Sequence, residues 1–260
     1  MREAAGTNPF NSTRPGNLFV GYEDLRRNLM SGLANGHSYA LLGGRRCGKT
    51  SLLLQLEADL RSTPAGARTL LPRHFDIQSE IPRTPTDFFQ SISRRLVDGT
   101  AVPPWDGSTQ GRQPYQSFGL YLHEFAPQLN EAHGPDWLCV LLIDELEVSA
   151  NYLDGDECFQ NLRHLLKRSE FATRLAVVIA GSTGLSELTK AGSALSNILE
   201  KATLAVLSPS DARRLMRSGH DAGRVADQTL SAAEEQLLTL TGGHPWMLQA
   251  LMEQIWEQRL

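Results

Sequence analysis

The sequence lacks several features that would place it in other protein classes. It has no apolar run of about 18 residues, the length a membrane-spanning helix needs, and no apolar stretch near its first residue that would act as a secretory signal. It has only three cysteines, and neither they nor the seven histidines have the spacing of a metal site. An odd set of cysteines is typical of a reducing compartment, so we expect a cytoplasmic protein.

An excess of positive charge is also absent. The chain has 25 Lys and Arg against 29 Asp and Glu, which gives a formal net charge of −4 over 260 residues. Proteins that bind nucleic acid through their overall charge are usually strongly basic. The composition therefore does not indicate nucleic-acid binding, although a local basic patch stays open. At 260 residues, the chain suits one large domain, or a core with a small appended one.

One motif organises the rest of the chain. An apolar run at 39–42 reads as a strand, leucines at helical spacing follow from residue 52, and GGRRCGKT between them matches G-x-x-x-x-G-K-[ST]. In such a loop backbone N–H groups surround phosphate oxygens, the lysine reaches the terminal phosphates, and the hydroxyl binds Mg²⁺. We predict that this loop binds a nucleotide. Lys49 is also predicted to take part in catalysis, and Thr50 is also predicted to be a ligand of Mg²⁺. The nucleotide-binding residues predicted from the loop are Gly43, Gly44, Arg45, Arg46, Cys47, Gly48, Lys49, Thr50 and Ser51.

Two acids follow an unbroken apolar run at 137–143, which is typical of a strand covered on both faces. At the carboxyl end of a central parallel strand, Asp144 is placed to hold Mg²⁺. Glu145 is placed to orient and deprotonate the attacking water. The structural alternative for an acid after a strand is a helix cap.

A further apolar strand, 175–180, ends before Ser182 and Thr183. A hydroxyl here would act as a sensor that contacts the γ-phosphate or the water. It would equally well cap the next helix, and both interpretations stay open.

The remaining pattern predicts an α/β fold in which a five-stranded parallel sheet is sandwiched by helices. The other two strands are expected at 68–77, where Pro72 indicates an edge position or a bend at the start, and at 202–207. Thr84 is expected to cap the helix that follows the first of these. Residues 98–114 hold three glycines, three prolines and Trp105, and read as a surface insertion. It is either a partner-binding loop or an insertion whose tryptophan packs back on the domain.

Beyond residue 207 the pattern is helical only. A capping box at 231–234 predicts one helix start, Gly242 and Gly243 end that helix, and Pro245 begins another. We therefore divide the chain into an extended arm at 1–17, a core at 18–207 and a small helical lid at 208–260.

These segments together resemble the AAA-like P-loop ATPases of the ASCE class, in particular the signal-transduction (STAND) and archaeal-type ATPase group. The more specific parts are RR-x-GKTSLL from Arg45 and GGHP-x-x-LQ from Gly242. The resemblance implies a lid whose Pro245, with His244 beside it, lies near the adenine or ribose. It also implies that Val20, Gly21 and Tyr22 pack against the adenine, with Tyr22 in place of the family's arginine.

The family likeness also implies a function, an ATPase that binds Mg²⁺ and ATP and acts as a switch or motor subunit on a partner protein. This lid has no arginine just after its glycines, as in the STAND branch, so hydrolysis is expected to be slow or partner-stimulated. Candidates for an arginine supplied by a neighbouring subunit are Arg163, Arg168 and Arg174. No effector segment follows the lid, so we expect a separately encoded partner or a homo-oligomer.

Two alternatives stay open, an adaptor or oligomerisation module with little turnover and an AAA-like ATPase of DNA transactions. A GTPase is disfavoured because no D-x-x-G follows the apolar strand at 137–143 and no guanine-reading acid is found. A transporter ATPase is disfavoured because no LSGGQ-like signature is present.

Overall fold

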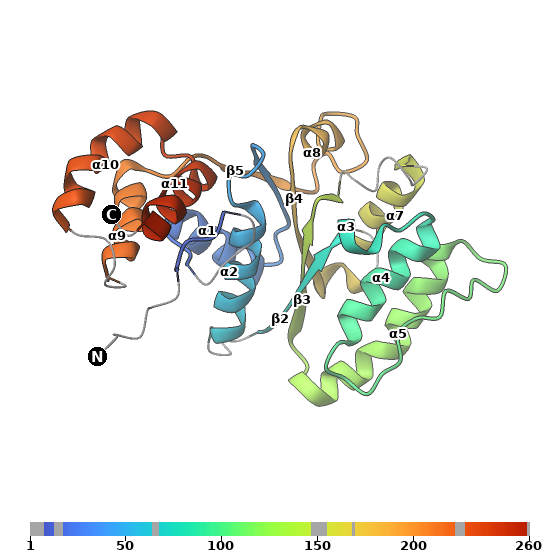
Figure 1. Ribbon diagram of the computed structural model, residues 1–260. Coiled ribbons are helices and arrows are strands. Elements are labelled where there is room, and N and C mark those ends of the chain that lie inside the picture. Colours follow the sequence, from blue (N-terminus) through green and yellow to red (C-terminus); the bar gives the residue numbers. More distant parts are fainter. Residues whose placement is uncertain are drawn as a thin grey trace. The chain divides into compact units, whose positions relative to one another are not determined.

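The computed structural model describes residues 8–12, 18–63, 68–146, 155–167, 170–221 and 227–258. Figure 1 shows its ribbon. The chain forms two compact units. The sheet unit contains Arg26–Gly43 and Leu53–Thr203, and the lid unit contains Met1–Leu25, Gly44–Leu52 and Leu204–Leu260.

The sheet unit is built on a five-stranded parallel sheet, as predicted. The strands are β1 (Tyr39–Gly43), β2 (Thr69–Asp76), β3 (Trp137–Asp144), β4 (Leu175–Gly181) and β5 (Glu200–Leu204). Their order is β2-β3-β4-β1-β5, so β2, with its proline, lies at an edge. Every residue of β3 and β4 is buried, as expected for apolar runs covered on both faces.

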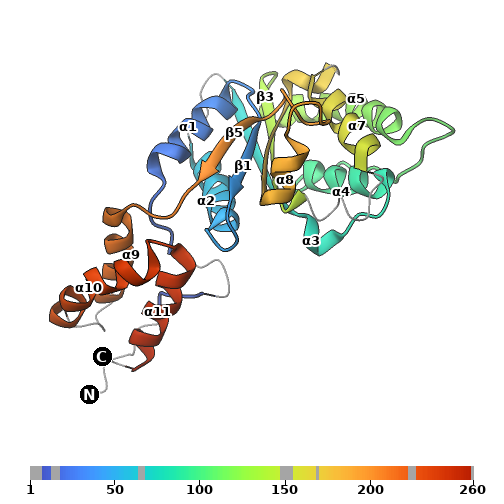
Figure 2. The same ribbon diagram turned by 90° about the horizontal axis from the view of Figure 1, so that it is seen from above.

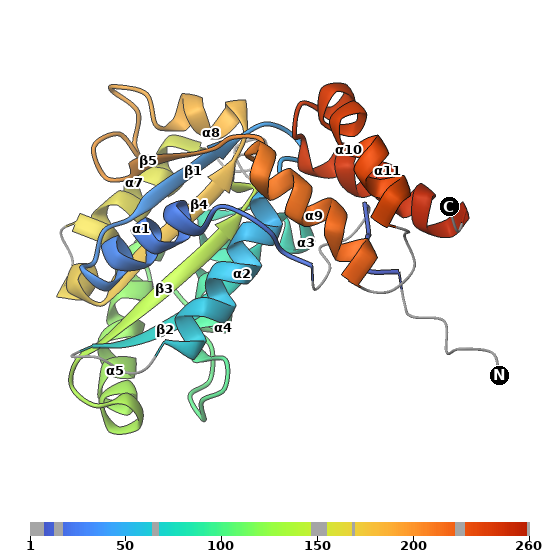
Figure 3. The same cartoon turned by 90° about the vertical axis from the view of Figure 1, so that its left-hand side faces the viewer.

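Helices cover both faces of this sheet. One face carries α4 (Pro85–Val97), α5 (Pro114–His133) and α7 (Gly155–Lys167), which share a core with alternate residues of β3 such as Cys139 and Leu141. The other face carries those parts of α1 (Glu23–Ala34) and α2 (Lys49–Ser62) that belong to the sheet unit (Figures 1, 2 and 3). The short helices are α3 (Ile77–Glu80), η1 (Glu170–Thr173) and α8 (Thr183–Leu188). No described helix is long and apolar enough to cross a membrane.

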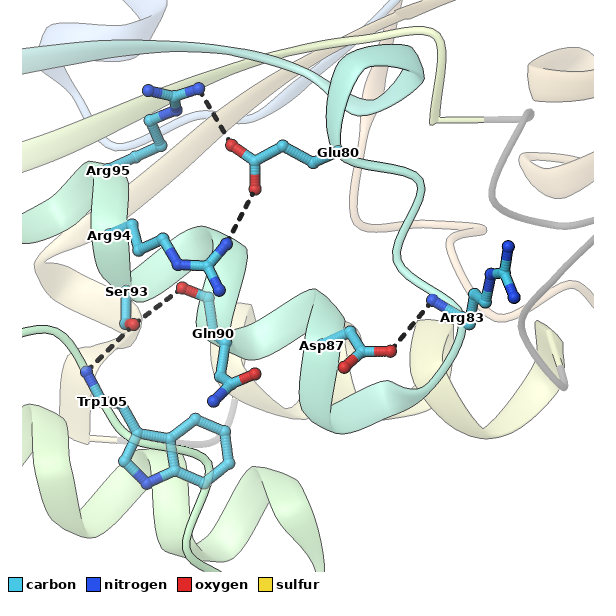
Figure 4. A network of polar contacts seen from close by, with 8 residues as sticks. All are labelled: Glu80, Arg83, Asp87, Gln90, Ser93, Arg94, Arg95 and Trp105. Carbon is cyan, nitrogen blue, oxygen red and sulfur yellow. Dashed lines mark hydrogen bonds and ion pairs between the residues drawn. The ribbon is translucent and has the colours of Figure 1, made fainter.

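The start of α4 confirms the predicted cap, and the last turn of α4 forms ion pairs with α3 (Figure 4). Thr84 is the N-cap, and it forms a capping box with Asp87. The preceding α3 is too short to give a helical pattern and was not predicted. Its last residue, Glu80, pairs with Arg95 at 2.9 Å and Arg94 at 3.5 Å, which ties α3 to α4.

The insertion at 98–114 is held by its tryptophan. Trp105 is 7% exposed, and its ring packs against Phe118 of α5. Its backbone N–H donates to Oγ of Ser93, which in turn donates to the carbonyl of Gln90 (Figure 4). The tryptophan thus packs back on the domain, which was the structural alternative.

The lid unit contains α9 (Pro209–Asp221), α10 (Asp227–Thr241) and α11 (Pro245–Gln258). Phe10, from the predicted arm, is 2% exposed and meets Trp256 edge to face. Residues 1–7 and 13–17 of that arm lie outside the described residues, and the division into arm, core and lid stays a prediction. The core of this unit consists of Phe10, Leu207, Ala212, Leu215, Met216, Leu237, Leu248, Met252 and Trp256.

Two predicted elements have other bounds than expected. The last strand is Glu200–Leu204 rather than 202–207, and beyond it the backbone N–H of Leu207 donates to the carbonyl of Gly243 at 3.0 Å. Helix α10 begins at Asp227 rather than at the expected capping box. The acid of that box, Glu234, accepts from Arg217 instead.

Candidate functional site

The predicted phosphate loop belongs to the lid unit from Gly44 onward. Arg46 has φ +60° and Gly48 has φ +95°, so left-handed residues turn the chain before α2 begins at Lys49. A Cβ built on Gly44 or Gly48 meets nothing within 4 Å. Glycine therefore leaves open space on the loop where a ligand oxygen can approach the backbone N–H groups.

Lys49, Thr50 and Cys47 take different places in the loop. The ammonium of Lys49 donates to the carbonyl of Gly44 at 2.9 Å, so it already lies over the glycine backbone. Thr50 is half-buried in the first turn of α2. Cys47 is 4% exposed, and burial raises the pKa of its thiol although the Lys49 charge opposes the shift. The thiol is a packing group at neutral pH.

A contact that sequence reasoning missed joins the loop to the lid helix. The guanidinium of Arg46 lies 4.3 Å from the ring centre of Trp246, which follows Pro245 in the first turn of α11. Such a cation–π pair contributes about 0.5–1 kcal/mol when exposed. Nothing in the spacing of the two residues predicts it, since they are 200 positions apart. The adjacent Arg45 is exposed.

The predicted adenine segment also contacts the loop within the lid unit. Gly21 has φ +91° and Tyr22 has φ +63°. The Tyr22 hydroxyl donates to the carbonyl of Ala205 at 2.9 Å and lies 3.5 Å from that of Cys47. Burial, with the nearby Cys47 and Asp211, raises the pKa of Tyr22.

Two further residues of the predicted adenine site belong to the lid unit. Val20 packs on the lid core. The Nδ1 atom of His244 is buried and has no hydrogen-bond partner in the described residues.

The predicted acids lie in the sheet unit, at its carboxyl edge. Asp144 ends β3 and is 4% exposed, and it is in register with Ala180 of β4. The backbone N–H of Glu145 donates to the carbonyl of Ala180 at 2.9 Å, and Glu145 has φ +55°. The strand pairing therefore fixes where both acids stand.

The predicted sensor residues follow the next strand. Ser182 is the N-cap residue of α8, but its side chain makes no capping hydrogen bond. Thr183 is the first residue of that helix. The capping alternative is therefore not supported for Ser182, and its sensor role stays a prediction.

The register also reveals an acid that sequence reasoning missed. Asp76, the last residue of β2, stands opposite Asp144. Its carboxylate caps α3 by accepting from the N–H of Gln78 at 2.9 Å and from the hydroxyl of Ser79 at 2.7 Å. Only the strand order could place it there, because the sequence does not say which strand lies beside β3.

Backbone strain coincides with the predicted site. Among the described residues, six that are not glycine have φ between +37° and +63°, and three of them are Tyr22, Arg46 and Glu145. Such conformations cost about 1–3 kcal/mol each and cluster at functional sites.

Two of the candidate arginines have structural contacts. Arg163 donates to the carbonyls of Ala194 and Ser196, each at 3.1 Å. Arg174 donates to the carbonyl of Trp137 and lies 5.0 Å from its ring centre. Arg168 lies outside the described residues.

No family model and no curated protein matches the sequence. Solved structures do match the fold. A Walker-type ATPase of Pyrococcus abyssi matches with a TM-score of 0.68 at 15% identity, over 94% of this chain and 71% of its own. The Aeropyrum pernix Orc1 protein, solved in complex with DNA, matches with a TM-score of 0.61 at 16% identity, over 94% and 62%. Cdc6p of Pyrobaculum aerophilum matches with a TM-score of 0.61 at 17% identity, over 96% and 64%. The chain therefore shares the fold of these three proteins, and it spans less than two thirds of the Orc1 and Cdc6p chains.

Proposed function

We propose that this protein binds Mg²⁺ and ATP at the loop Gly43–Thr50, hydrolyses the ATP, and uses the nucleotide state as a switch on a partner. The observation that carries the proposal is the loop itself. It joins β1 to α2, matches the phosphate-binding motif, and has open space beside Gly44 and Gly48.

The acids at the carboxyl edge of the sheet fit the rest of the chemistry. Gly43, where the loop begins, ends β1, and β4 lies between β1 and β3. The Thr50 hydroxyl and the Asp144 carboxylate are oxygen donors, which Mg²⁺ prefers, and Asp144 is almost fully buried. When bound, the metal would neutralise charge on the phosphates. Glu145 would hold the attacking water and accept its proton.

The contacts of the loop within the lid unit support a switch. Arg46 stacks on Trp246, and the Tyr22 hydroxyl joins the loop to the segment that leads into α9. Phosphates bound at the loop would interact with the Arg46 guanidinium and with the loop backbone, which are the groups that contact Trp246 and Tyr22. Nucleotide binding would therefore change contacts that start α11 and precede α9, including those near Pro245.

The test measures ATP binding and turnover in three variants. Lys49→Ala should lower ATP affinity about 10- to 150-fold, because a charge-assisted phosphate contact contributes about 1.5–3 kcal/mol. Lys190→Ala is the matched control. Lys190 lies just after α8 and pairs with Glu187, and this variant should bind ATP as the wild type does. Glu145→Gln should bind ATP and lose turnover. If Lys49→Ala binds ATP like the control, the proposal fails.

The same Glu145→Gln variant tests whether the ATP-bound protein binds a partner. We propose that this interaction takes place in the cytoplasm. Trapped with ATP, it should retain a separately encoded protein, or a second copy of this chain, that ADP releases. If wild type shows no turnover with that partner present, the adaptor alternative replaces the enzyme.

A DNA transaction is the second candidate function, and the observation that favours it is the fold likeness to Orc1 in complex with DNA. The net charge of −4 gives no general attraction to a polyanion. Fluorescence anisotropy of labelled duplex DNA, measured with ATP at several salt concentrations, tests it. If the logarithm of the association constant falls linearly with the logarithm of the salt concentration, the result supports this function. If no binding is seen at low salt, the function is excluded.

A further inference from the structure

A cavity lies in the sheet unit, among helices α4, α5 and α7, which Figures 1 and 2 show packed together. Its volume is about 170 Å³. Gln116 and His164 are exposed at its mouth, and the ring of Tyr115 meets that of His164 edge to face at 5.7 Å. The residues that line it are Phe89, Tyr115, Gln116, Phe118, Gly119, Asn161, His164 and Leu165.

The floor of the cavity is apolar except for one amide. Phe89 and Phe118 stack with ring centres 5.1 Å apart, and Leu165 is 5% exposed. Asn161 is 7% exposed, and its Nδ2 is buried with no hydrogen-bond partner among the described residues. A buried amide without a partner is costly, and a ligand oxygen would remove that cost.

A glycine keeps the cavity open. Gly119 lies inside α5, where glycine lowers the helix equilibrium about fivefold relative to alanine. A Cβ at this position meets nothing within 4 Å, and its φ is not left-handed, so neither crowding nor backbone geometry requires glycine. The consequence of having no side chain at Gly119 is the open volume of the cavity beside this residue.

We propose that this cavity is a binding site for a small aromatic molecule that carries a hydroxyl or carbonyl oxygen. An apolar cavity of about 150 Å³ takes benzene, so this one has room for a substituted single ring. The aromatic lining favours a flat ring, and the Asn161 amide selects the oxygen. The site lies outside the proposed nucleotide site and does not depend on it.

The experiment uses phenol and toluene, which have nearly the same shape and differ in the oxygen. Each is titrated into the full chain by NMR, with the methyl signals of Leu165 as the local readout. We expect saturable phenol binding that shifts these signals. Asn161→Leu should weaken phenol about fivefold, the value of one neutral hydrogen bond, and leave toluene unchanged.

Gly119→Leu should fill the cavity and weaken both ligands at least tenfold, while its melting temperature shows that it folds. Glu124→Leu, which adds a leucine at an exposed position of the same helix, should bind both ligands like the wild type. No saturable phenol binding, or equal binding by Gly119→Leu and wild type, would overturn the proposal. Equal weakening of both ligands by Asn161→Leu would overturn the role of the amide. Lys49→Ala should bind phenol normally, which separates this site from the nucleotide site.

Discussion

The turn between α10 and α11 offers a sharp test of how the lid unit is held. Gly242 has φ +56° and Gly243 has φ +75°, so an alanine at either position is strained by about 1–2 kcal/mol. The two positions differ in their surroundings. A Cβ on Gly242 meets nothing within 4 Å, whereas one on Gly243 lies 2.5 Å from the backbone carbonyl oxygen of Leu207.

The expected loss of unfolding free energy in each variant follows from this difference in surroundings. Real Cβ atoms essentially never come closer than 3.0 Å, so Gly243→Ala must displace backbone. That displacement strains the hydrogen bond from the Leu207 N–H to the Gly243 carbonyl. Overpacking of this kind costs about 1–3 kcal/mol. We expect Gly243→Ala to lose about 2–5 kcal/mol of unfolding free energy and Gly242→Ala only about 1–2 kcal/mol.

The assay is urea unfolding of the wild type and the two variants, followed by tryptophan fluorescence, since Trp246 and Trp256 belong to the lid unit. Gly242→Ala is the matched control, because it carries the backbone strain without the collision. Equal losses in the two variants would show that the packing of Gly243 on the Leu207 backbone does not stabilise this unit.

Two further predictions concern the sheet unit and the tyrosines. Trp105→Ala should lower the unfolding free energy by about 3–5 kcal/mol in urea titrations, because a nearly buried ring is removed, and Trp105→Phe should lose less. A loss of unfolding free energy below about 1 kcal/mol in Trp105→Ala would mean that packing of this ring does not stabilise the insertion. Burial raises the pKa of Tyr121 to about 12, and burial also raises the pKa of Tyr22 and Tyr39. These groups keep their protons in the folded chain after the unfolded chain has lost them, so stability should be unaffected below pH about 10 and should fall as the pH rises from there toward about 12. Urea midpoints that stay constant through this window would contradict the assignment.

The sequence by itself predicted those elements of this fold whose signals are local. The phosphate-loop motif between an apolar run and a leucine repeat predicted β1 and α2, and unbroken apolar runs predicted the buried strands β3 and β4. The cap at Thr84 and the helix stop at Gly242 also depend on neighbouring residues alone. The fold class followed from the alternation of strands and helices, and the structural neighbours confirm it.

The tertiary structure decided what depends on distant parts of the chain. The strand order places Asp76 beside Asp144, and the fold of the lid unit brings Arg46 to Trp246. The backbone N–H of Leu207 donates to the carbonyl of Gly243 instead of continuing the last strand. No local pattern encodes these pairings, because each joins segments far apart in sequence whose meeting is set by packing. The cavity beside Gly119 is of the same kind, since a glycine in a helix has meaning only once its neighbours surround it.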